Sequence, residues 1–541
     1  MAGRPGRPFG VSTVAGSTKG AADTAAAPGR HTAEFLRVKA LAQRGVASAQ
    51  HRLGFMYFNG DQVGRDYEQA LYWYLKAGYA GLDSAQYNLG VMYQRGVGVA
   101  RDAQLAAHWY IMAAEQGYAA AQYNLGWLYA KGQGVALDVQ AARFWFTKAA
   151  QQGNAGAQNN LGLMHESGKG AAQDYALACA WYRQAAEQGY ARAQFNLALR
   201  YDSGQGVEQD AQLAVDWLRK AAAQGYAPAQ FNLALRYDKG QHLAQDTGQA
   251  IAWYQRAAEQ GHASAQFNLA LIYDTAQAPV RDDALALAWF RKAAEQGHAG
   301  AQDHLGLRYE HGSGVEPDFV QACGWYRKAA EQGFAGAQYH LGQLYHAGLG
   351  VQADAHMAAG WLRKAADQGH LRAQFELALR YEGGLGVPRD EGAAMAWYRR
   401  AAEKDYVPAQ FMLGVMYDKT DGALALEWYL KAAAQGHARA QFELGLRYDS
   451  GKGVARSYET AYAWYIRAAR QGHARAQFNL GLMHASGQGA RRDLLAAYAW
   501  LLQAERGGLP AAGKYLHETQ ARMNPAQREH LGRLVAQLEQ S

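Results

Sequence analysis

The chain has 541 residues, of which 49% are hydrophobic and 19% are charged, and its 54 Lys and Arg against 47 Asp and Glu leave a formal net charge of +7. Spread over this length, that charge is too dilute to indicate a nucleic-acid partner. No stretch approaches the roughly 20 apolar residues of a membrane-spanning helix, so the sequence predicts no membrane span.

Residues 1–30 are rich in Pro, Gly, Ala, Ser and Thr, and we expect them to form a disordered tail. They lack the apolar core of about 7 to 15 residues that a secretory signal needs. A transit peptide is an alternative, because this segment has four basic residues, Arg4, Arg7, Lys19 and Arg30, and a single acidic residue, Asp23. However, its Pro and Gly residues disfavour the amphipathic helix that a transit peptide requires. We therefore expect a soluble cytoplasmic protein, or a periplasmic or secreted one if the true start lies elsewhere.

Residues 31–45 should form an N-terminal capping helix, because their end copies the end of a repeated unit. That unit fills residues 46–508 and is seen clearly in Ala193 to Tyr226. It opens with an Ala-Gln pair that recurs every 36 residues, apart from one 31-residue step between Gln410 and Gln441. The pair stands at residues 49–50, 85–86, 121–122, 157–158, 193–194, 229–230, 265–266, 301–302, 337–338, 373–374, 409–410, 440–441 and 476–477. A fixed short period predicts an array in which each unit contacts only its neighbours.

Each unit reads as a pair of helices. On a helical wheel, the apolar residues of Ala193 to Tyr201 cover an arc of about 240°, which indicates burial on both flanks. Each full unit has Gly or Ala at the repeat position of Ala198, and this small residue lets the partner helix approach closely. The second helix carries a Trp seven residues after the Asp that precedes the helix, as Trp217 follows Asp210. We expect these Trp side chains to lie in the core.

The two helices are joined by a Gly-x-Gly-Val-x-x-Asp loop, as in residues 96–102. Glycine permits the left-handed turn and the Asp is placed to cap the next helix. Spaced glycines also suggest a phosphate-binding loop, but the Lys-Ser/Thr of that motif is missing. Two loops depart from the pattern. The region 405–421 lacks the capping Gly and five loop residues, and residues 275–280 lack glycine, so each is either a bend or a tolerated change of loop.

Residues 509–541 are expected to form a half-repeat and a C-terminal capping helix. The run Asn524-Pro525-Ala526-Gln527 has the chemistry of a helix start, and Leu531, Leu534, Val535 and Leu538 fall on one face of the helix that follows. That face should cover the last Trp-bearing helix, as the end of a repeat array requires.

The motifs A-Q-x-x-L-G/A-x-x-Y, G-x-G-V-x-x-D and A-x-x-W-Y-x-x-A-A-x-Q-G closely resemble the Sel-1-like repeat family, relatives of the tetratricopeptide repeats. The resemblance covers about residues 46–518. It implies an all-α fold, an α-solenoid wound as a right-handed superhelix of about 13 helix-turn-helix repeats of 36 residues. It also implies a role as an adaptor or scaffold for protein complexes.

Catalytic and metal sites are not indicated. The two cysteines, Cys179 and Cys323, share a repeat position four units apart and should be free, buried thiols. The densest histidine group, His304, His311, His340 and His346, lacks the i, i+4 pair that one helix would offer to zinc. No nucleophile and base arrangement stands out, so we expect no enzyme activity, no metal and no cofactor.

The thin polar stripe of the first helices is the candidate binding site. If these helices line the concave wall, their arginines can hold carboxylates or carbonyls of an extended protein or peptide. Alternatively, Glu376 with Arg380 and Glu443 with Arg447 are ordinary i, i+4 pairs on a solvated face. The candidate residues are Arg192, Asn196, Arg200, Asn232, Arg236, His304, Arg308, His340, Glu376, Arg380, Glu443 and Arg447. The sequence thus favours a non-catalytic interaction scaffold over an exported, envelope-associated enzyme or cell-wall binder.

Overall fold

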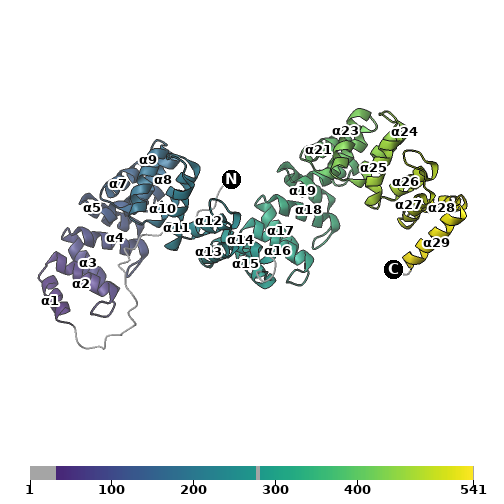
Figure 1. Cartoon of the computed structure of the whole chain (residues 1–541). Helices are drawn as coiled ribbons and strands as arrows, with labels where there is room; N and C mark the ends of the chain where they lie inside the picture. The colour runs from purple at the N-terminus through teal and green to yellow at the C-terminus, as the bar shows by residue number, and fades with distance from the viewer. Residues whose placement is uncertain (1–31, 276–280, 540–541) are drawn as a thin grey trace. The chain divides into compact units, whose positions relative to one another are not determined.

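The computed structural model describes residues 32–275 and 281–539, which form 29 α-helices and, within those ranges, no strand. Consecutive helices pack against each other from α1 to α13 and again from α15 to α28 (Figure 1). The chain divides into two compact units, residues 1–269 and 270–541. Each unit is an all-α solenoid of stacked helix pairs, as the repeat predicted.

Every repeat contributes two helices, of 13 residues in most repeats. The first helices are α2 (Ala47–Asn59), α4 (Asp83–Arg95), α6 (Ala119–Lys131), α8 (Ala155–Ser167), α10 (Ala191–Ser203), α12 (Ala227–Lys239), α14 (Ala263–Thr275), α16 (Ala299–His311), α18 (Ala335–Ala347), α20 (Leu371–Gly383), α22 (Val407–Tyr417), α24 (Ala438–Ser450) and α26 (Ala474–Ser486). The second helices are α3 (Tyr67–Tyr79), α5 (Ala103–Glu115), α7 (Val139–Gln151), α9 (Tyr175–Glu187), α11 (Ala211–Ala223), α13 (Thr247–Glu259), α15 (Asp283–Glu295), α17 (Phe319–Glu331), α19 (Ala355–Asp367), α21 (Glu391–Ala402), α23 (Gly422–Ala434), α25 (Tyr458–Arg470) and α27 (Leu494–Arg506).

Helix ends follow the loop chemistry. Asp102 caps α5 by accepting hydrogen bonds from the backbone N–H groups of Gln104 and Leu105, and the same arrangement recurs along the chain. Most first helices end at a left-handed glycine such as Gly204, whose φ is 69°. Two residues later in the loop, Gly206 lies so close to the backbone of Tyr175 that a Cβ would come within 2.2 Å of its carbonyl oxygen. Loop glycine is therefore required by the packing as well as by the turn.

The most deeply buried large side chains of the second helices lie one residue after each Trp. This corrects the expectation that the Trp side chains themselves lie in the core. The residue that follows each Trp is almost fully buried, and Tyr182, for example, packs against Gly162, where a Cβ would meet its ring at 2.5 Å. Most of the tryptophans themselves are half-buried, as Trp217 is. A basic side chain three residues later covers the ring, and Lys220 Nζ lies 4.1 Å from the Trp217 ring centroid.

The Gln of the Ala-Gln pair is buried because it joins neighbouring helices. Gln194 Nε2 donates to the carbonyl oxygen of Ala186 at 3.1 Å, and Gln194 Oε1 accepts from Gln224 Nε2 at 2.7 Å. Equivalent bonds recur in both units, among them Gln332 to Gln302 at 2.8 Å. A polar side chain is stable at this depth because its donor and its acceptor are both satisfied.

The repeat of residues 407–437 accommodates its shortened loop without losing its core. Asp405 adopts a φ of 60° in place of the usual glycine, and Asp421 still caps α23. One apolar cluster continues from Tyr398 through Leu413 to Tyr429. These contacts agree with a tolerated change of loop length. The other irregular loop, residues 276–280, lies outside the described residues.

Three helices flank the repeats: α1 (Ala33–Gln43), α28 (Ala512–Ala521) and α29 (Pro525–Glu539). In α1, Phe35 is fully buried with Leu53 of the first repeat. Leu531 of α29 is buried with Leu494 and Ala497 of α27. The expected tail of residues 1–30 lies outside the described residues, as do the side chains of Leu534, Val535 and Leu538.

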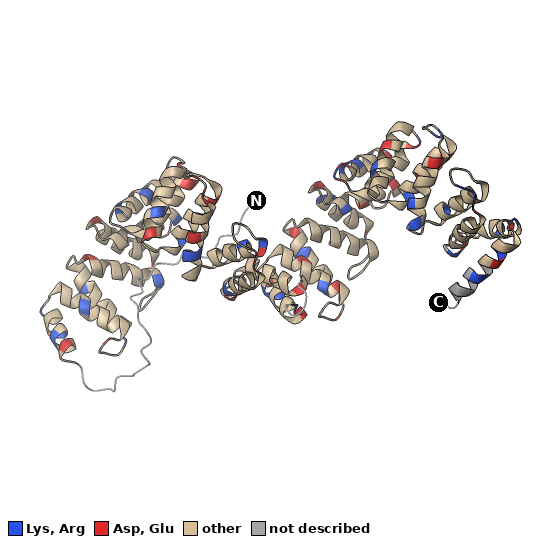
Figure 2. Cartoon of the chain, viewed as in Figure 1, with Lys and Arg blue, Asp and Glu red and all other residues tan. Residues whose placement is uncertain are grey.

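Acidic and basic residues are interspersed over both units (Figure 2). None of the described helices is both long and apolar enough to cross a membrane. Cys179 and Cys323 are free and buried, as expected.

Candidate functional site

A hollow of about 550 Å³ lies on the first helices of the N-terminal unit. Its lining comes mainly from α2, α4, α6 and α8, and Tyr190, which precedes α10, also contributes. Most of the lining side chains are aromatic rings or asparagines, namely Phe55, Phe58, Asn59, Tyr74, Tyr87, Asn88, Tyr118, Tyr123, Asn124, Asn154 and Tyr190. Arg95 adds one positive charge. We call this hollow the aromatic groove.

Rings at neighbouring first helices of the aromatic groove pack against each other, as Tyr87 of α4 does against Tyr118, which precedes α6. The ring centroids of Tyr87 and Tyr118 lie 5.1 Å apart. Burial raises the pKa of both hydroxyls, and it raises the pKa of Tyr123 to about 12, so all three stay protonated near neutral pH. The surface can therefore receive apolar side chains through its rings and main-chain carbonyls through its hydroxyl and amide donors.

Small residues keep the aromatic groove open. Ala120 and Gly156 occupy one repeat position in α6 and α8, and Arg192 fills the same position in the next repeat. A Cβ on Gly156 would approach the ring of Tyr123 to 3.0 Å. The groove residues were not predicted, although the sequence holds their signal: Tyr and small residues coincide in adjacent repeats.

The polar stripe predicted on the first helices links neighbouring repeats. Asn196 Nδ2 donates to Asn159 Oδ1 at 3.0 Å, and His340 Nδ1 lies 2.9 Å from Asp303 Oδ1. Asn232 instead donates to the carbonyl oxygen of Pro228 in its own helix at 2.9 Å. Two of the groove asparagines, Asn88 and Asn124, hold the repeat position of Asn196. The stripe and the aromatic groove thus share one face of the first helices.

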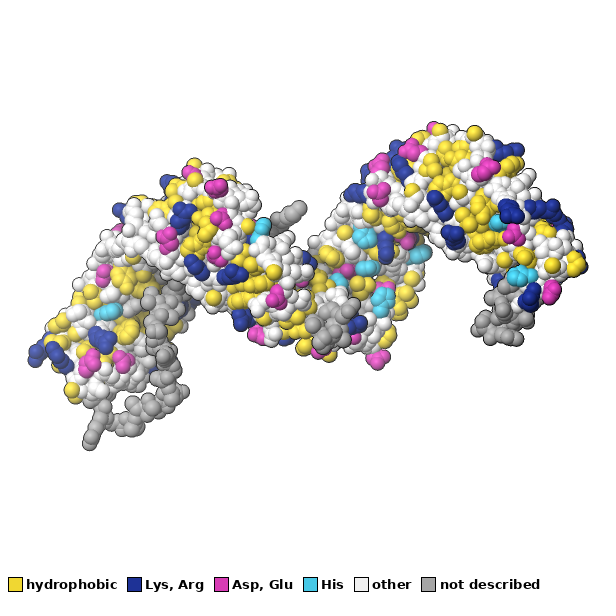
Figure 3. Space-filling view, in the orientation of Figure 1, with side chains coloured by type: hydrophobic (Ala, Val, Ile, Leu, Met, Phe, Trp, Pro, Cys, Tyr) yellow, Lys and Arg dark blue, Asp and Glu magenta, His cyan; other side chains and the backbone are white. Residues whose placement is uncertain are grey.

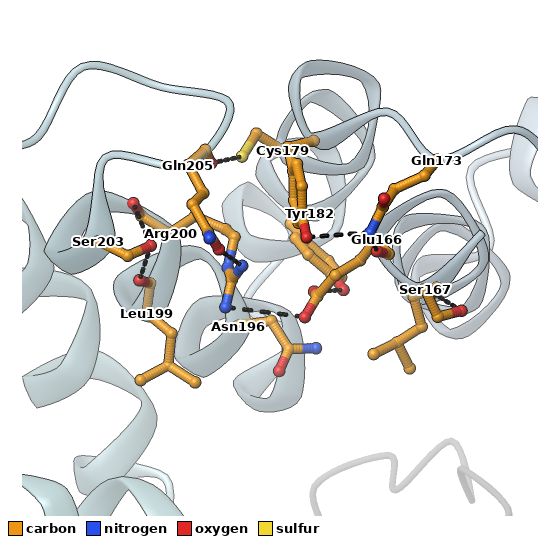
Figure 4. Close-up of polar contacts among 12 residues, drawn as sticks. Glu166, Ser167, Gln173, Cys179, Tyr182, Asn196, Leu199, Arg200, Ser203 and Gln205 are labelled. Carbon is orange, nitrogen blue, oxygen red and sulfur yellow. Dashed lines mark hydrogen bonds and ion pairs between the residues drawn. The ribbon is translucent and has the colours of Figure 1, made fainter.

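Five of the stripe arginines share the repeat position of Arg200, and four of these five form ion pairs with an acid of the preceding repeat. Arg200 Nη2 lies 3.7 Å from Glu166 Oε1, and Glu166 also accepts a hydrogen bond of 2.6 Å from the Tyr182 hydroxyl (Figure 4). Burial, together with the Glu166 carboxylate, raises the pKa of Tyr182. The other pairs are Arg236 with Asp202 at 2.6 Å, Arg308 with Asp274 and Arg447 with Asp418. The guanidinium groups therefore serve in the stacking of repeats.

This geometry corrects the expected i, i+4 pairs. Among the described residues, Arg447 pairs with Asp418, and neither Glu443 with Arg447 nor Glu376 with Arg380 comes within ion-pair distance. Burial raises the pKa of the Glu443 carboxyl, the nearby Asp418 adds to the rise, and Arg447 opposes it. Arg192, Glu376 and Glu443 are half-buried, whereas Arg236, Arg308, Arg380 and Arg447 are buried. The twelve stripe residues are distributed from α10 to α24 and do not gather at one place.

The four histidines considered as a metal site, His304, His311, His340 and His346, have separate environments and do not converge. His304 stacks on Phe290 with centroids 5.1 Å apart, His340 pairs with Asp303, and His311 and His346 are exposed. Histidine side chains lie over α16 and α18 in the space-filling view (Figure 3). Within the described ranges, no three His, Cys, Asp or Glu residues come together as metal ligands would. Burial is the main cause that lowers the pKa of His304.

Histidines that follow the capping glycine have a role that the sequence did not reveal. His437 Nδ1 accepts a hydrogen bond of 3.2 Å from the backbone N–H of Ala440, and His437 also lies 4.7 Å from the ring centroid of Phe411. His262, His298, His370 and His473 cap their helices in the same way. Asn154 performs this task with its side-chain oxygen in α8.

Comparison with known proteins agrees with the repeat geometry. The Sel1 repeat model matches thirteen consecutive segments that run from residue 47 to residue 509. A solved uropathogenic Escherichia coli protein, described as a protective antigen displaying an SLR fold, is 35% identical over 90% of this chain and 96% of that chain, with a TM-score of 0.61. A Sel1 repeat protein from Oxalobacter formigenes is 34% identical over 58% of this chain and 90% of that one, with a TM-score of 0.45. No curated protein matches the chain. With thirteen matched repeats that cover most of its length, the chain belongs to the Sel1 repeat family.

Proposed function

We propose that this protein is a non-catalytic scaffold that binds an extended segment of a partner protein in the aromatic groove. Sel1 repeat proteins are generally protein-interaction scaffolds, and the family is typically non-catalytic. The observation that carries the proposal is the 550 Å³ hollow with its rings and asparagines. Because its lining combines apolar faces with fixed donors, it suits a peptide that inserts apolar side chains and presents main-chain carbonyls.

The predicted stripe extends the proposed binding face beyond the groove. Asn196 and Asn232 continue the repeat position of Asn88 and Asn124, and Arg192 stands where the small groove residues end. On this proposal the stripe asparagines guide the bound segment along the first helices. The buried arginines act chiefly by fixing the repeats that present this face.

The test uses residues that other repeats already tolerate. Phe55→Gln introduces the residue that another repeat has at the same position, Gln343. Tyr118→Asn likewise introduces the residue found at the same position in the next repeat, Asn154. Peptides selected from a displayed library on the wild-type protein should bind the double variant at least about tenfold more weakly, which corresponds to about 1.4 kcal/mol. Binding is measured by fluorescence anisotropy with purified proteins.

Leu213→Gln is the matched control. Leu213 on α11 is 40% exposed, close to the 41% of Phe55, and Gln249 holds its position in another repeat. This variant should bind the selected peptides as the wild type does. Equal affinity of the groove variant and the wild type would refute the assignment of the site.

A second candidate, an exported binder at the cell envelope, is favoured by one observation. The Escherichia coli protein that is 35% identical to this chain is described as a protective antigen. Cell fractionation of the native protein and sequencing of its mature N-terminus distinguish the two candidates. Recovery only in the cytoplasmic fraction would exclude the exported form.

A further inference from the structure

Arginine at the pairing position, defined by Arg200, Arg236, Arg308, Arg380 and Arg447, normally has a fixed partner. In the four ion pairs above, Nη2 of the arginine meets the carboxylate of an acid at the end of the preceding first helix. Arg308 and Asp274 are 34 residues apart, and Arg447 and Asp418 are 29 apart because their loop is five residues shorter. The repeat therefore specifies one position from which a carboxylate reaches the guanidinium.

Arg380 is the exception among these five. His346 occupies the position 34 residues before it, where the other pairs have Asp or Glu. Arg380 is only 3% exposed, and its Nε and Nη1 atoms are buried without a hydrogen-bond partner. Burial lowers the pKa of Arg380, and the carboxylate of Glu376, one turn earlier in α20, only partly opposes this effect. A buried cation without a contacting anion is costly, so this site lacks a ligand that the repeat supplies elsewhere.

The place of the missing carboxylate is accessible from solvent. In the four complete pairs, the acid side chains keep 27% to 38% of their surface exposed although the arginines are largely buried. His346 is itself exposed. An anion from outside can therefore reach the position that Asp or Glu occupies in the other repeats, and the imidazole of His346 can add a donor there.

We propose that Arg380 and His346 form a recognition site for a carboxylate from an acidic side chain of a bound partner segment. This identity of the ligand rests on the proposed scaffold function, whereas the anion site itself rests on the geometry of the five pairing positions. A carboxylate is the favoured ligand because the group that meets Nη2 in all four ion pairs is a carboxylate. A protein that presents an Asp or Glu at this point gains a charge-assisted contact that the free scaffold lacks.

The experiment is thermal unfolding of the full chain in sodium glutarate, in inorganic phosphate and in sodium chloride at equal ionic strength. Glutarate should raise the unfolding midpoint of the wild type above its value in chloride by about 1–2 °C. Two variants should lose this difference. Arg380→Met removes the guanidinium and introduces a residue that Met416 and Met483 supply in other repeats, and His346→Asp supplies the internal partner.

His311→Asp is the control, because it makes the same change of charge at another exposed histidine and should retain the response to glutarate. Equal midpoints of the wild type in glutarate and chloride, or an undiminished response in Arg380→Met, would overturn the site. A response to phosphate alone would overturn its assignment to an acidic side chain. None of these results depends on peptide binding in the aromatic groove, so the two proposals fail separately.

Discussion

At the residue scale, the effect of an arginine at the pairing position depends on its partner. Arg236 and Arg380 hold the same place in their repeats and are 8% and 3% exposed, but only Arg236 has an acid against it. Removing a charge whose partner stays behind destabilises a fold, whereas removing an unpartnered buried charge does not. The two positions therefore form a matched pair for mutation.

We predict that Arg236→Met lowers the stability of its region by about 1–2 kcal/mol, because Asp202 loses its ion pair. Arg380→Met should leave stability unchanged or raise it. Hydrogen exchange of the amides in α10–α12 and α18–α20, with the urea unfolding midpoint, measures both effects. Destabilisation of the two regions by the same amount would contradict the difference in pairing.

The sequence located these arginines, but it could not show their direction. A helical wheel places Arg236 on the polar stripe, but its long side chain ends at Asp202 of the neighbouring helix. Burial of Trp217 was overestimated for a similar reason. Trp217 and Leu218 both fall on the inward stripe, and only the packing of the next helix determines that Leu218 lies deeper.

At the scale of the element, the helix boundaries were predictable because their causes are local. An Asp that accepts from the next turn and a glycine with positive φ act within a few residues, as Asp210 and Gly204 show. The histidine caps were not predicted, because Tyr226 and Phe334 occupy the same repeat position without a side-chain cap bond, so this position has no constant capping residue.

These histidine caps predict a dependence of stability on pH. Burial lowers the pKa of His262, His370, His437 and His473, and their Nδ1 atoms can accept the capping bond only when unprotonated. The unfolded chain thus binds protons more readily than the folded chain. The stabilisation is complete above the ordinary histidine pKa and is lost as pH falls below it.

Accordingly, the temperature midpoint of unfolding should decrease when the pH is lowered from about 7.5 to about 5.5. These values lie on either side of the ordinary histidine pKa of about 6.5. Asn at His437 and His473 should keep the cap, as Asn154 does, and make this fall shallower. Each cap contributes about 0.5–1 kcal/mol. Melting curves that shift equally in the wild type and in the double Asn variant would rule out a role of these two histidines.

At the scale of the whole molecule, the 36-residue period was sufficient to predict a solenoid, because each repeat buries its apolar face only against its neighbours. The aromatic groove was not predictable in this way. It depends on which rings and which small residues coincide in successive repeats, such as Tyr123 with Gly156, and a single repeat contains no sign of it. The repeat predicts the scaffold, and departures from the repeat create the site.

Site-specific photocrosslinking tests the proposed binding face most directly. Benzoylphenylalanine is placed at Phe55 in the aromatic groove or at Leu213 on α11, two positions of nearly equal exposure. A peptide selected on the wild-type protein should crosslink from position 55 and not from position 213. Crosslinking from position 213 alone, or equally from both positions, would contradict binding in the groove.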